Sequence, residues 1–183
     1  MSRVVQVSVI GAATGDDELL GHAESVGRLL AHKGVALVCG GGSGVMEAAS
    51  RGAGSAGGVV IGVLRGSDAA EANEFVTHTV ATGIGHARNL AVVASGDAVI
   101  AVGGEWGTLS EIAFARKLGR NVVALDSWSL RNRAHGDLGS ATSPWRRRFP
   151  MRAVALARGP LRRGKAAARA VSRLGGTSGA PSG

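Results

Sequence analysis

The chain of 183 residues is 45% hydrophobic but only 3% aromatic, so its core must consist of Val, Ala, Leu and Ile, which suits parallel strands buried on both faces. Its net charge of +8 is uneven: residues 1–126 hold 9 basic and 12 acidic residues, whereas residues 127–183 hold 12 basic residues and Asp137 as the one acidic residue. A single cysteine, no apolar run of roughly 18 residues and no signal-peptide pattern argue against a disulfide-bonded, membrane-spanning or exported chain, and we expect a cytoplasmic protein without membrane contact.

Strand and helix signals alternate along residues 1–126, with short connections between them. The expected strands cover residues 4–10, 35–39, 59–64, 75–80, 98–102 and 122–125. The expected helices cover residues 16–33, 46–53, 85–95 and 109–118. Alternating strands and helices indicate right-handed crossovers and a parallel sheet. The sequence therefore predicts an α/β fold: a Rossmann-like, doubly wound parallel sheet in a three-layer α/β/α arrangement.

Beyond residue 126 the alternation stops. Three consecutive arginines, Arg146 to Arg148, all four prolines and a Gly/Ser-rich end predict a basic, low-complexity, disordered tail over residues 127–183. One hypothesis for so abrupt a change is an out-of-frame reading of a GC-rich gene, which the other reading frames would test. A basic run without interleaved aromatic residues is usually solvated, so we rank a contact with nucleic-acid phosphates lowest among the functions.

Two glycine-rich loops follow expected strands and open expected helices: residues 40–44 follow strand 35–39, and residues 103–108 follow strand 98–102. Open α/β sheets bind ligands at the carboxyl ends of their strands, where helix N-termini offer free N–H groups and glycine lets an anion approach the backbone. Two such loops in one sheet favour a shared phosphate over two tight turns. The expected phosphate- or ligand-binding residues are Gly40, Gly41, Gly42, Ser43, Gly103, Gly104, Gly107 and Thr108.

Several kinds of site are not expected. The absence of Gly-Lys-Ser/Thr argues against a P-loop. A dinucleotide fingerprint lacks its third glycine, and no acidic residue ends the strand 59–64, where Leu64-Arg65-Gly66 stands. The histidines and acidic residues have no metal-ligand spacing, and no Ser/His/Asp or Cys/His arrangement is evident. We therefore expect a phosphorylated small molecule as partner, with neither a metal ion nor a bound cofactor.

Three further residues each allow two interpretations. The segment from Thr108 to Glu111 fits a capping box, in which both side chains satisfy free N–H groups at a helix start, and the spacing favours this over catalysis. A carboxylate one turn inside a phosphate-binding helix can also orient or deprotonate a water. Arg88 is either a solvated surface arginine or a planar donor to the ligand. Trp106 either stacks on a base or covers the pocket.

These residues resemble a known family. The segment from Val102 to Glu111, VGGEWGTLSE, resembles the GGxGTxxE signature of the LOG family, long labelled possible lysine decarboxylases. Upstream, Arg88-Asn89 lies where those proteins carry an Arg-Lys pair, and residues 40–46 resemble their earlier glycine loop. The resemblance covers about residues 4–125 in the same order.

The resemblance implies a Rossmann-like homodimer and, in the LOG enzymes, a phosphoribohydrolase. These enzymes cleave the N-glycosidic bond of a cytokinin riboside 5′-monophosphate or of AMP, releasing the base and ribose 5-phosphate. Carried over by position, Arg88 and Glu111 would form the catalytic pair, while the second loop would hold the 5′-phosphate. A decarboxylase is not expected, because residues 1–126 contain only Lys33 and Lys117 and no evident pyridoxal lysine.

Two positions depart from the LOG pattern. Val102 stands where LOG enzymes have a proline, and Asn89 stands where they have a lysine. At these positions the sequence resembles a sister branch that includes molybdenum cofactor carrier proteins. In the carrier proteins, the same loops bind a phosphorylated pterin without turnover. Two functions stay open: hydrolysis of nucleoside 5′-monophosphates, and carriage or sensing of a phosphorylated ligand such as molybdenum cofactor.

Overall fold

The computed structural model describes residues 3–128, 131–132 and 136–137. Almost all of the tail expected over residues 127–183 lies outside these residues. Within it, the described residues include two short antiparallel strands, β7 (Arg131–Asn132) and β8 (Gly136–Asp137). No helix in the described part of the chain is long and apolar enough to cross a membrane.

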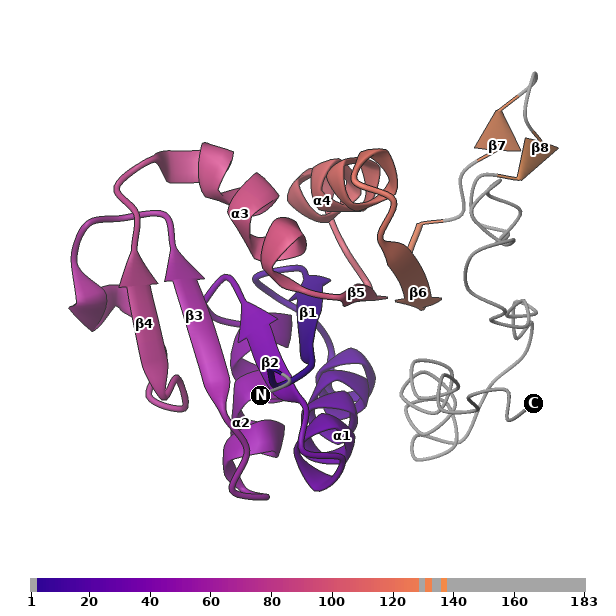
Figure 1. The fold of residues 1–183 in the computed structure, drawn as a ribbon. Coiled ribbons are helices and arrows are strands. Elements are labelled where there is room, and N and C mark those ends of the chain that lie inside the picture. Colours follow the sequence, from indigo (N-terminus) through magenta and orange to yellow (C-terminus); the bar gives the residue numbers. More distant parts are fainter. Residues whose placement is uncertain (1–2, 129–130, 133–135, 138–183) are drawn as a thin grey trace, which may run out of the picture.

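A six-stranded, wholly parallel sheet forms the centre of the molecule (Figure 1). Its strands are β1 (Gln6–Gly11), β2 (Ala36–Cys39), β3 (Val60–Leu64), β4 (His78–Ala81), β5 (Ala98–Val102) and β6 (Asn121–Leu125). The helices are α1 (Asp17–His32), α2 (Val45–Gly54), α3 (Arg88–Ser95) and α4 (Trp106–Lys117), with short 3₁₀ turns η1 (Ala69–Glu71) and η2 (Gly85–Ala87). The predicted Rossmann-like α/β fold is confirmed.

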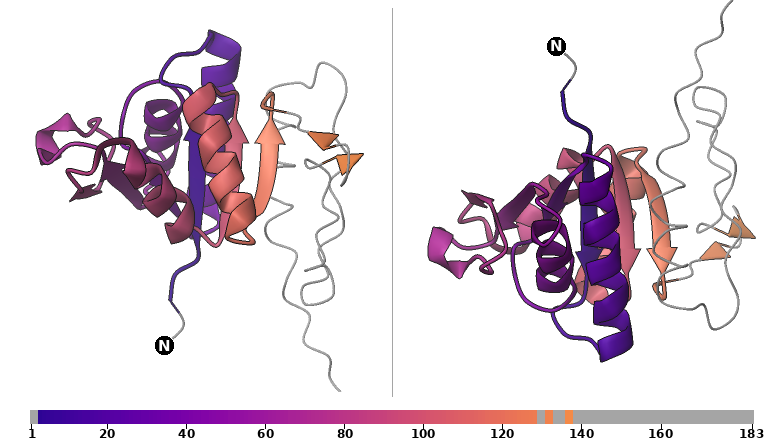
Figure 2. Two further views of the ribbon diagram at one scale, coloured as in Figure 1. Left: turned by 90° about the horizontal axis from the view of Figure 1, so that it is seen from above. Right: turned by 90° about the horizontal axis from the view of Figure 1, so that it is seen from below.

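The helices cover both faces of the sheet. Alternate residues of a strand point to opposite faces; in β1, Val7 and Val9 pack with α1 and α2, whereas Ile10 packs with α3 and α4. The central strands β1, β2 and β5 are buried along nearly their whole length. Figure 2 shows the two helical layers on either side of the sheet. The low aromatic content is compatible with this core, because it is built from small aliphatic side chains.

The strand order β4-β3-β2-β1-β5-β6 reverses direction between β1 and β5. From β1 the chain moves outward through β2, β3 and β4, then returns to the other side of β1 and continues to β6. A doubly wound sheet binds ligands in the crevice at such a reversal, outside the carboxyl ends of the strands. The fold therefore places the loops after β1, β2 and β5 at its expected binding position.

Several expected boundaries are wrong, among them the start of the strand expected over residues 75–80, which begins only at His78 as β4. Val4 and Val5 are exposed and precede β1 instead of starting it. The helix expected over residues 85–95 is divided into η2 and α3. The helix expected from residue 109 begins at Trp106, because Gly103 and Gly104 adopt positive φ angles that turn the chain directly after β5.

Candidate ligand-binding site

The two glycine loops lie on either side of the end of β1. The loop 40–44 follows β2, and the loop beginning at Gly103 follows β5; both strands pair with β1. A β-carbon at Gly11, the last residue of β1, would lie 2.5 Å from the Val102 carbonyl oxygen and would overlap the Val45 side chain. The end of β5 and the start of α2 thus both touch Gly11, as expected for loops that share one site.

The starts of α2 and α4 have no capping side chain. Neither N-cap residue, Gly44 of α2 or Glu105 of α4, accepts a hydrogen bond through its side chain. Some nearby amides do have protein partners: Val45 N donates to the Ala12 carbonyl at 3.1 Å, and Gly103 N to the Leu125 carbonyl at 2.9 Å.

Other amides of the two loops have no acceptor. Among the residues that the structure describes, nothing accepts a hydrogen bond from Gly42, Ser43 or Gly104, or from the first three amides of α4. Free N–H groups and the positive dipole end make a helix N-terminus a binding site for anions. These amides are therefore available to phosphate oxygens.

Gly104 and Gly107 leave the start of α4 bare for different reasons. Gly104 has a φ angle of 135°, which side-chain-bearing residues rarely adopt, and the buried Thr108 side chain packs beneath it. A β-carbon at Gly107 would meet no atom within 4 Å, so the fold itself does not require glycine there. A ligand that approaches the backbone would account for it.

Arg88, the first residue of α3, lies across the first glycine loop. A β-carbon at Gly40 would come within 2.5 Å of Arg88 Nη2, so the guanidinium can occupy this place only because residue 40 is glycine. Arg88 Nη1 donates to Glu111 Oε1 at 3.5 Å, and the side chain is 13% exposed. Its Nε is buried without a partner in the described part of the chain. Arg88 is thus a part-buried donor and not a solvated surface arginine.

The electrostatics of this arginine are those of a buried cation. Burial lowers the pKa of Arg88, and the negative charge of Glu111 partly opposes this effect. The positive charge of the exposed Arg65, the residue after β3, lowers it further. Two cations at the carboxyl edge of the sheet favour an anionic ligand, which would stabilise both.

Glu111 does not belong to a capping box, and that interpretation is wrong. Because α4 begins at Trp106, Thr108 and Glu111 lie inside the helix, and Glu105 takes the N-cap position. The Glu111 carboxylate is buried beside Arg88. Burial raises the pKa of Glu111 to about 7, although the charge of Arg88 acts in the opposite direction. Such a carboxylate exchanges its proton near neutral pH, as a general base does.

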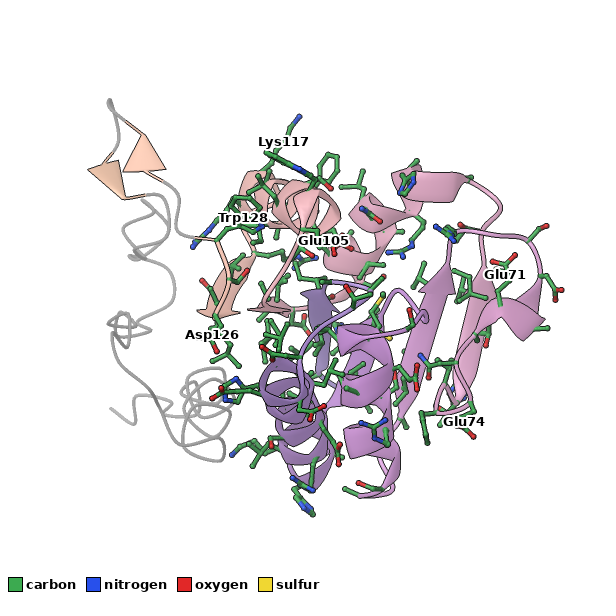
Figure 3. All side chains as sticks on the ribbon, turned by 180° about the vertical axis from the view of Figure 1, so that it is seen from behind. Glu71, Glu74, Glu105, Lys117, Asp126 and Trp128 are labelled. Atoms are coloured by element: carbon green, nitrogen blue, oxygen red, sulfur yellow. The ribbon has the colours of Figure 1, made fainter. Side chains whose placement is uncertain are left out.

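The remaining predicted residues have more local roles. The Ser43 hydroxyl donates to the Ala13 carbonyl at 3.1 Å, which leaves its amide as its free donor. Trp106 is 78% exposed, and its ring centroid lies 5.6 Å from that of Trp128. Trp128 Nε1 donates to the Glu105 carbonyl at 3.3 Å, and Figure 3 shows these two residues together beside α4. Trp106 therefore rests on a fixed neighbour at the start of α4.

Sequence reasoning missed three residues of this region. Gly11 could have been found, because it directly follows the strand expected over residues 4–10. Arg65 and Asn73 could not, because the segment between β3 and β4 has no motif; yet Asn73 donates to the carbonyls of Gly41 and Gly42. Within the described residues, no group of three or more His, Cys, Asp or Glu side chains could hold a metal ion.

Comparisons with known proteins identify the family. The SLOG cluster4 family model matches residues 4–146. An uncharacterized protein of Archaeoglobus fulgidus is 48% identical over 124 residues, 67% of this chain and 81% of that protein. The molybdenum cofactor binding protein of Rippkaea orientalis has a similar structure, with a TM-score of 0.67, 38% identity, and coverage of 70% of this chain and 79% of that one.

The Moco carrier protein of Chlamydomonas reinhardtii is similar as well. Its TM-score is 0.63 and its identity 35%, over 69% of this chain and 79% of the algal chain. The resemblance to LOG-like proteins, on the branch near molybdenum cofactor carriers, is thereby confirmed. The chain belongs to the SLOG cluster4 family.

Proposed function

We propose that this protein is a non-catalytic carrier of a phosphorylated small molecule, of the class of phosphorylated pterins that includes molybdenum cofactor. The observation that carries the proposal is that two uncapped helix starts and the part-buried Arg88 side chain gather at one edge of the sheet. The similarity to the carrier of Chlamydomonas reinhardtii and the binding protein of Rippkaea orientalis supports this choice of ligand.

In this proposal the phosphate group is held by the backbone and by one cation. The free amides of Gly42, Ser43 and the start of α4 donate to phosphate oxygens, and the Arg88 guanidinium supplies charge-assisted hydrogen bonds. The phosphorylated pterin and the metal bound to it would be the cargo, and they would leave the protein together. No bond in the ligand needs to break for this function.

Native mass spectrometry of the protein, purified from cells that synthesise molybdenum cofactor, tests the proposal directly. We expect a co-purified ligand whose mass fits a phosphorylated pterin and which, after oxidation, has pterin fluorescence. The Arg88→Ala variant should lose it, while the matched Arg51→Ala variant should keep it, because Arg51 pairs with Glu24 between α1 and α2. A ligand without phosphate, or equal loading of both variants, would contradict the proposal.

A second function is favoured by one specific feature, the buried Glu111 carboxylate with its pKa of about 7 beside Arg88. If the ligand is a nucleoside 5′-monophosphate, ionised Glu111 can take a proton from a water that attacks C1′ of the ribose. The glycosidic C–N bond breaks, the base takes up a proton from solvent as it leaves, Glu111 later returns its proton to solvent, and ribose 5-phosphate remains. A carboxylate also stabilises the oxocarbenium-like transition state.

Incubation with AMP and other nucleoside 5′-monophosphates separates the two functions. Release of free base that disappears in Glu111→Ala would establish hydrolysis. No release from any monophosphate, with phosphate binding retained, would leave the carrier. The homodimer, the cytoplasmic location and the lack of a nucleic-acid partner stay predictions, which sedimentation, fractionation of cells and DNA retention measure.

A further inference from the structure

Asn73, in the segment between η1 and β4, contacts the glycine loop after β2 through three hydrogen bonds. Its side-chain Nδ2 donates to the Gly41 carbonyl at 3.1 Å and to the Gly42 carbonyl at 2.9 Å. Its backbone N also donates to the Gly41 carbonyl, at 2.8 Å. Residues about thirty positions apart in the chain are joined in this way.

These bonds fix the direction of two peptide planes. In a trans peptide the C=O and N–H groups point in opposite directions, and the described chain has no cis peptide bond. The Gly41 carbonyl shares its peptide with the Gly42 amide, and the Gly42 carbonyl with the Ser43 amide. Both carbonyls point at Asn73. The Gly42 and Ser43 amides therefore point away from Asn73 and from the segment between β3 and β4.

We propose that Asn73 is the positioning residue of the anion site: it holds the glycine loop so that the Gly42 and Ser43 amides face the ligand. This inference rests on the proposed function. Consecutive glycines populate many backbone conformations, so a loop of three can turn its peptides over at little steric cost. A side chain that binds both carbonyls removes this freedom before the ligand arrives and so favours binding.

Asn73 has separate groups for its own segment. Its Oδ1 accepts a hydrogen bond from Phe75 N at 3.2 Å, and its carbonyl accepts one from Val76 N at 3.1 Å. The side-chain nitrogen therefore acts on the glycine loop alone. Asn73→Asp keeps the acceptor for Phe75 and replaces the donor with an oxygen that repels the two carbonyls.

The test is a titration of ¹⁵N-labelled protein with inorganic phosphate, followed through the amide resonances. In the unchanged protein we expect Gly42, Ser43 and the start of α4 to shift together. In Asn73→Asp and Asn73→Ala the Gly42 and Ser43 shifts should be lost and phosphate affinity should fall about tenfold, as the loss of one to two hydrogen bonds implies. Gly107 should still respond.

Thr77→Val is the matched control. Thr77 belongs to the same segment, donates to the Val60 carbonyl at 2.8 Å and accepts from Val60 N at 2.9 Å, at the opposite end of β3. The Thr77→Val substitution removes hydrogen bonds of this segment and leaves the contacts of the glycine loop unchanged. A merely structural role for Asn73 predicts that all three variants lose stability and bind phosphate alike, which would overturn the inference.

Two further outcomes are distinct. If the unchanged protein shows shifts in α4 but none at Gly42 and Ser43, the anion site stands and the role of Asn73 is overturned. If neither region responds, the proposed function fails, and the role of Asn73 fails with it. Should both Asn73 variants fail to fold, a crystal structure of the unchanged protein with phosphate decides: Gly42 and Ser43 amides turned away from the anion would contradict the inference.

Discussion

At the start of α1, the Asp16 carboxylate accepts a hydrogen bond from Leu19 N at 2.8 Å, and Asp17 and Glu18 add negative charge. At the start of α4 the N-cap residue, Glu105, is exposed and accepts no capping hydrogen bond, while Glu111 inside the helix is buried beside Arg88. The two helices have similar positions in the fold: α1 follows β1, α4 follows β5, and these two strands pair with each other.

The difference separates a structural helix start from one that is free to bind. At a start capped by a carboxylate, that group accepts a hydrogen bond from a free amide and its negative charge repels other anions. Such a start therefore offers little to a phosphate. An uncapped start leaves donors that only solvent or a ligand can satisfy. We expect substitutions at α1 to change stability alone and substitutions around α4 to change binding.

The buried Glu111 should make stability depend on pH. Its pKa is about 7 in the folded chain against an ordinary value of 4.5, so between these values the folded chain holds one more proton than the unfolded chain. The free energy of unfolding should therefore fall as pH rises through this window, by roughly 3 kcal/mol, and should level off above it.

Glu111→Gln should remove this fall, because it cannot ionise. Urea unfolding of both proteins at a series of pH values across the window measures the difference. Parallel curves for the two proteins would contradict the assignment, since they would mean that Glu111 titrates alike in the folded and unfolded chains.

Arg88→Ala should weaken binding of a phosphorylated ligand roughly tenfold to a hundredfold, as expected for the loss of hydrogen bonds from a charged donor. It should also raise the pKa of Glu111 further, because Arg88 opposes the effect of burial. Calorimetry with AMP, or with the ligand that co-purifies, measures the affinity. An unchanged affinity would return Arg88 to a structural role beside Glu111.

Much of the fold and part of the site could be predicted from the sequence. Runs such as Val-Ile-Ala-Val in β5 and the glycines after β2 and β5 report local structure, so strand positions and loop chemistry were accessible. The partnership of Arg88 with Gly40 and Glu111 depends on strand order, which brings three distant segments together. Asn73 could not be found, because a lone asparagine in a loop has no pattern.

The capping-box error has a related cause. Spacing between Thr108 and Glu111 fits a capping box only if Thr108 is the N-cap residue. The true N-cap is Glu105, three residues earlier, because the positive φ angles of Gly103 and Gly104 turn the chain there. A spacing rule depends on the register of the helix, and backbone turns decide that register.

Gly40→Ala tests how closely Arg88 approaches the first loop. The new methyl group would lie 2.5 Å from Arg88 Nη2, so the guanidinium, which is the far end of a flexible side chain, must move away from the loop with little change in the free energy of unfolding. Ligand affinity should fall. In the control Gly54→Ala, at the end of α2, the added β-carbon meets no atom within 4 Å. Equal ligand affinity of the two variants would argue against the contact.

Asp16→Ala removes the cap of α1 and should cost about 1 kcal/mol of stability, with no change in phosphate affinity. Thermal unfolding and the phosphate titration, run on the same variant, measure both quantities. Weaker phosphate binding in this variant would erase the distinction between capped and open helix starts.

Gly107→Ala has the smallest expected effect and the opposite sign. Its β-carbon enters open space in a helix, so stability should rise by up to about 1 kcal/mol. Phosphate affinity should nevertheless fall, because the methyl group narrows the approach to the start of α4. A variant that is more stable and binds equally well would show that the ligand does not come close to Gly107.

A crystal structure with AMP, or with the co-purified ligand, tests most directly whether the open helix starts bind the anion. We predict phosphate oxygens about 3 Å from the amide nitrogens of Gly42, Ser43 and the first turn of α4, with Arg88 turned toward them. A phosphate bound at the start of α1, or one that contacts neither glycine loop, would contradict the account.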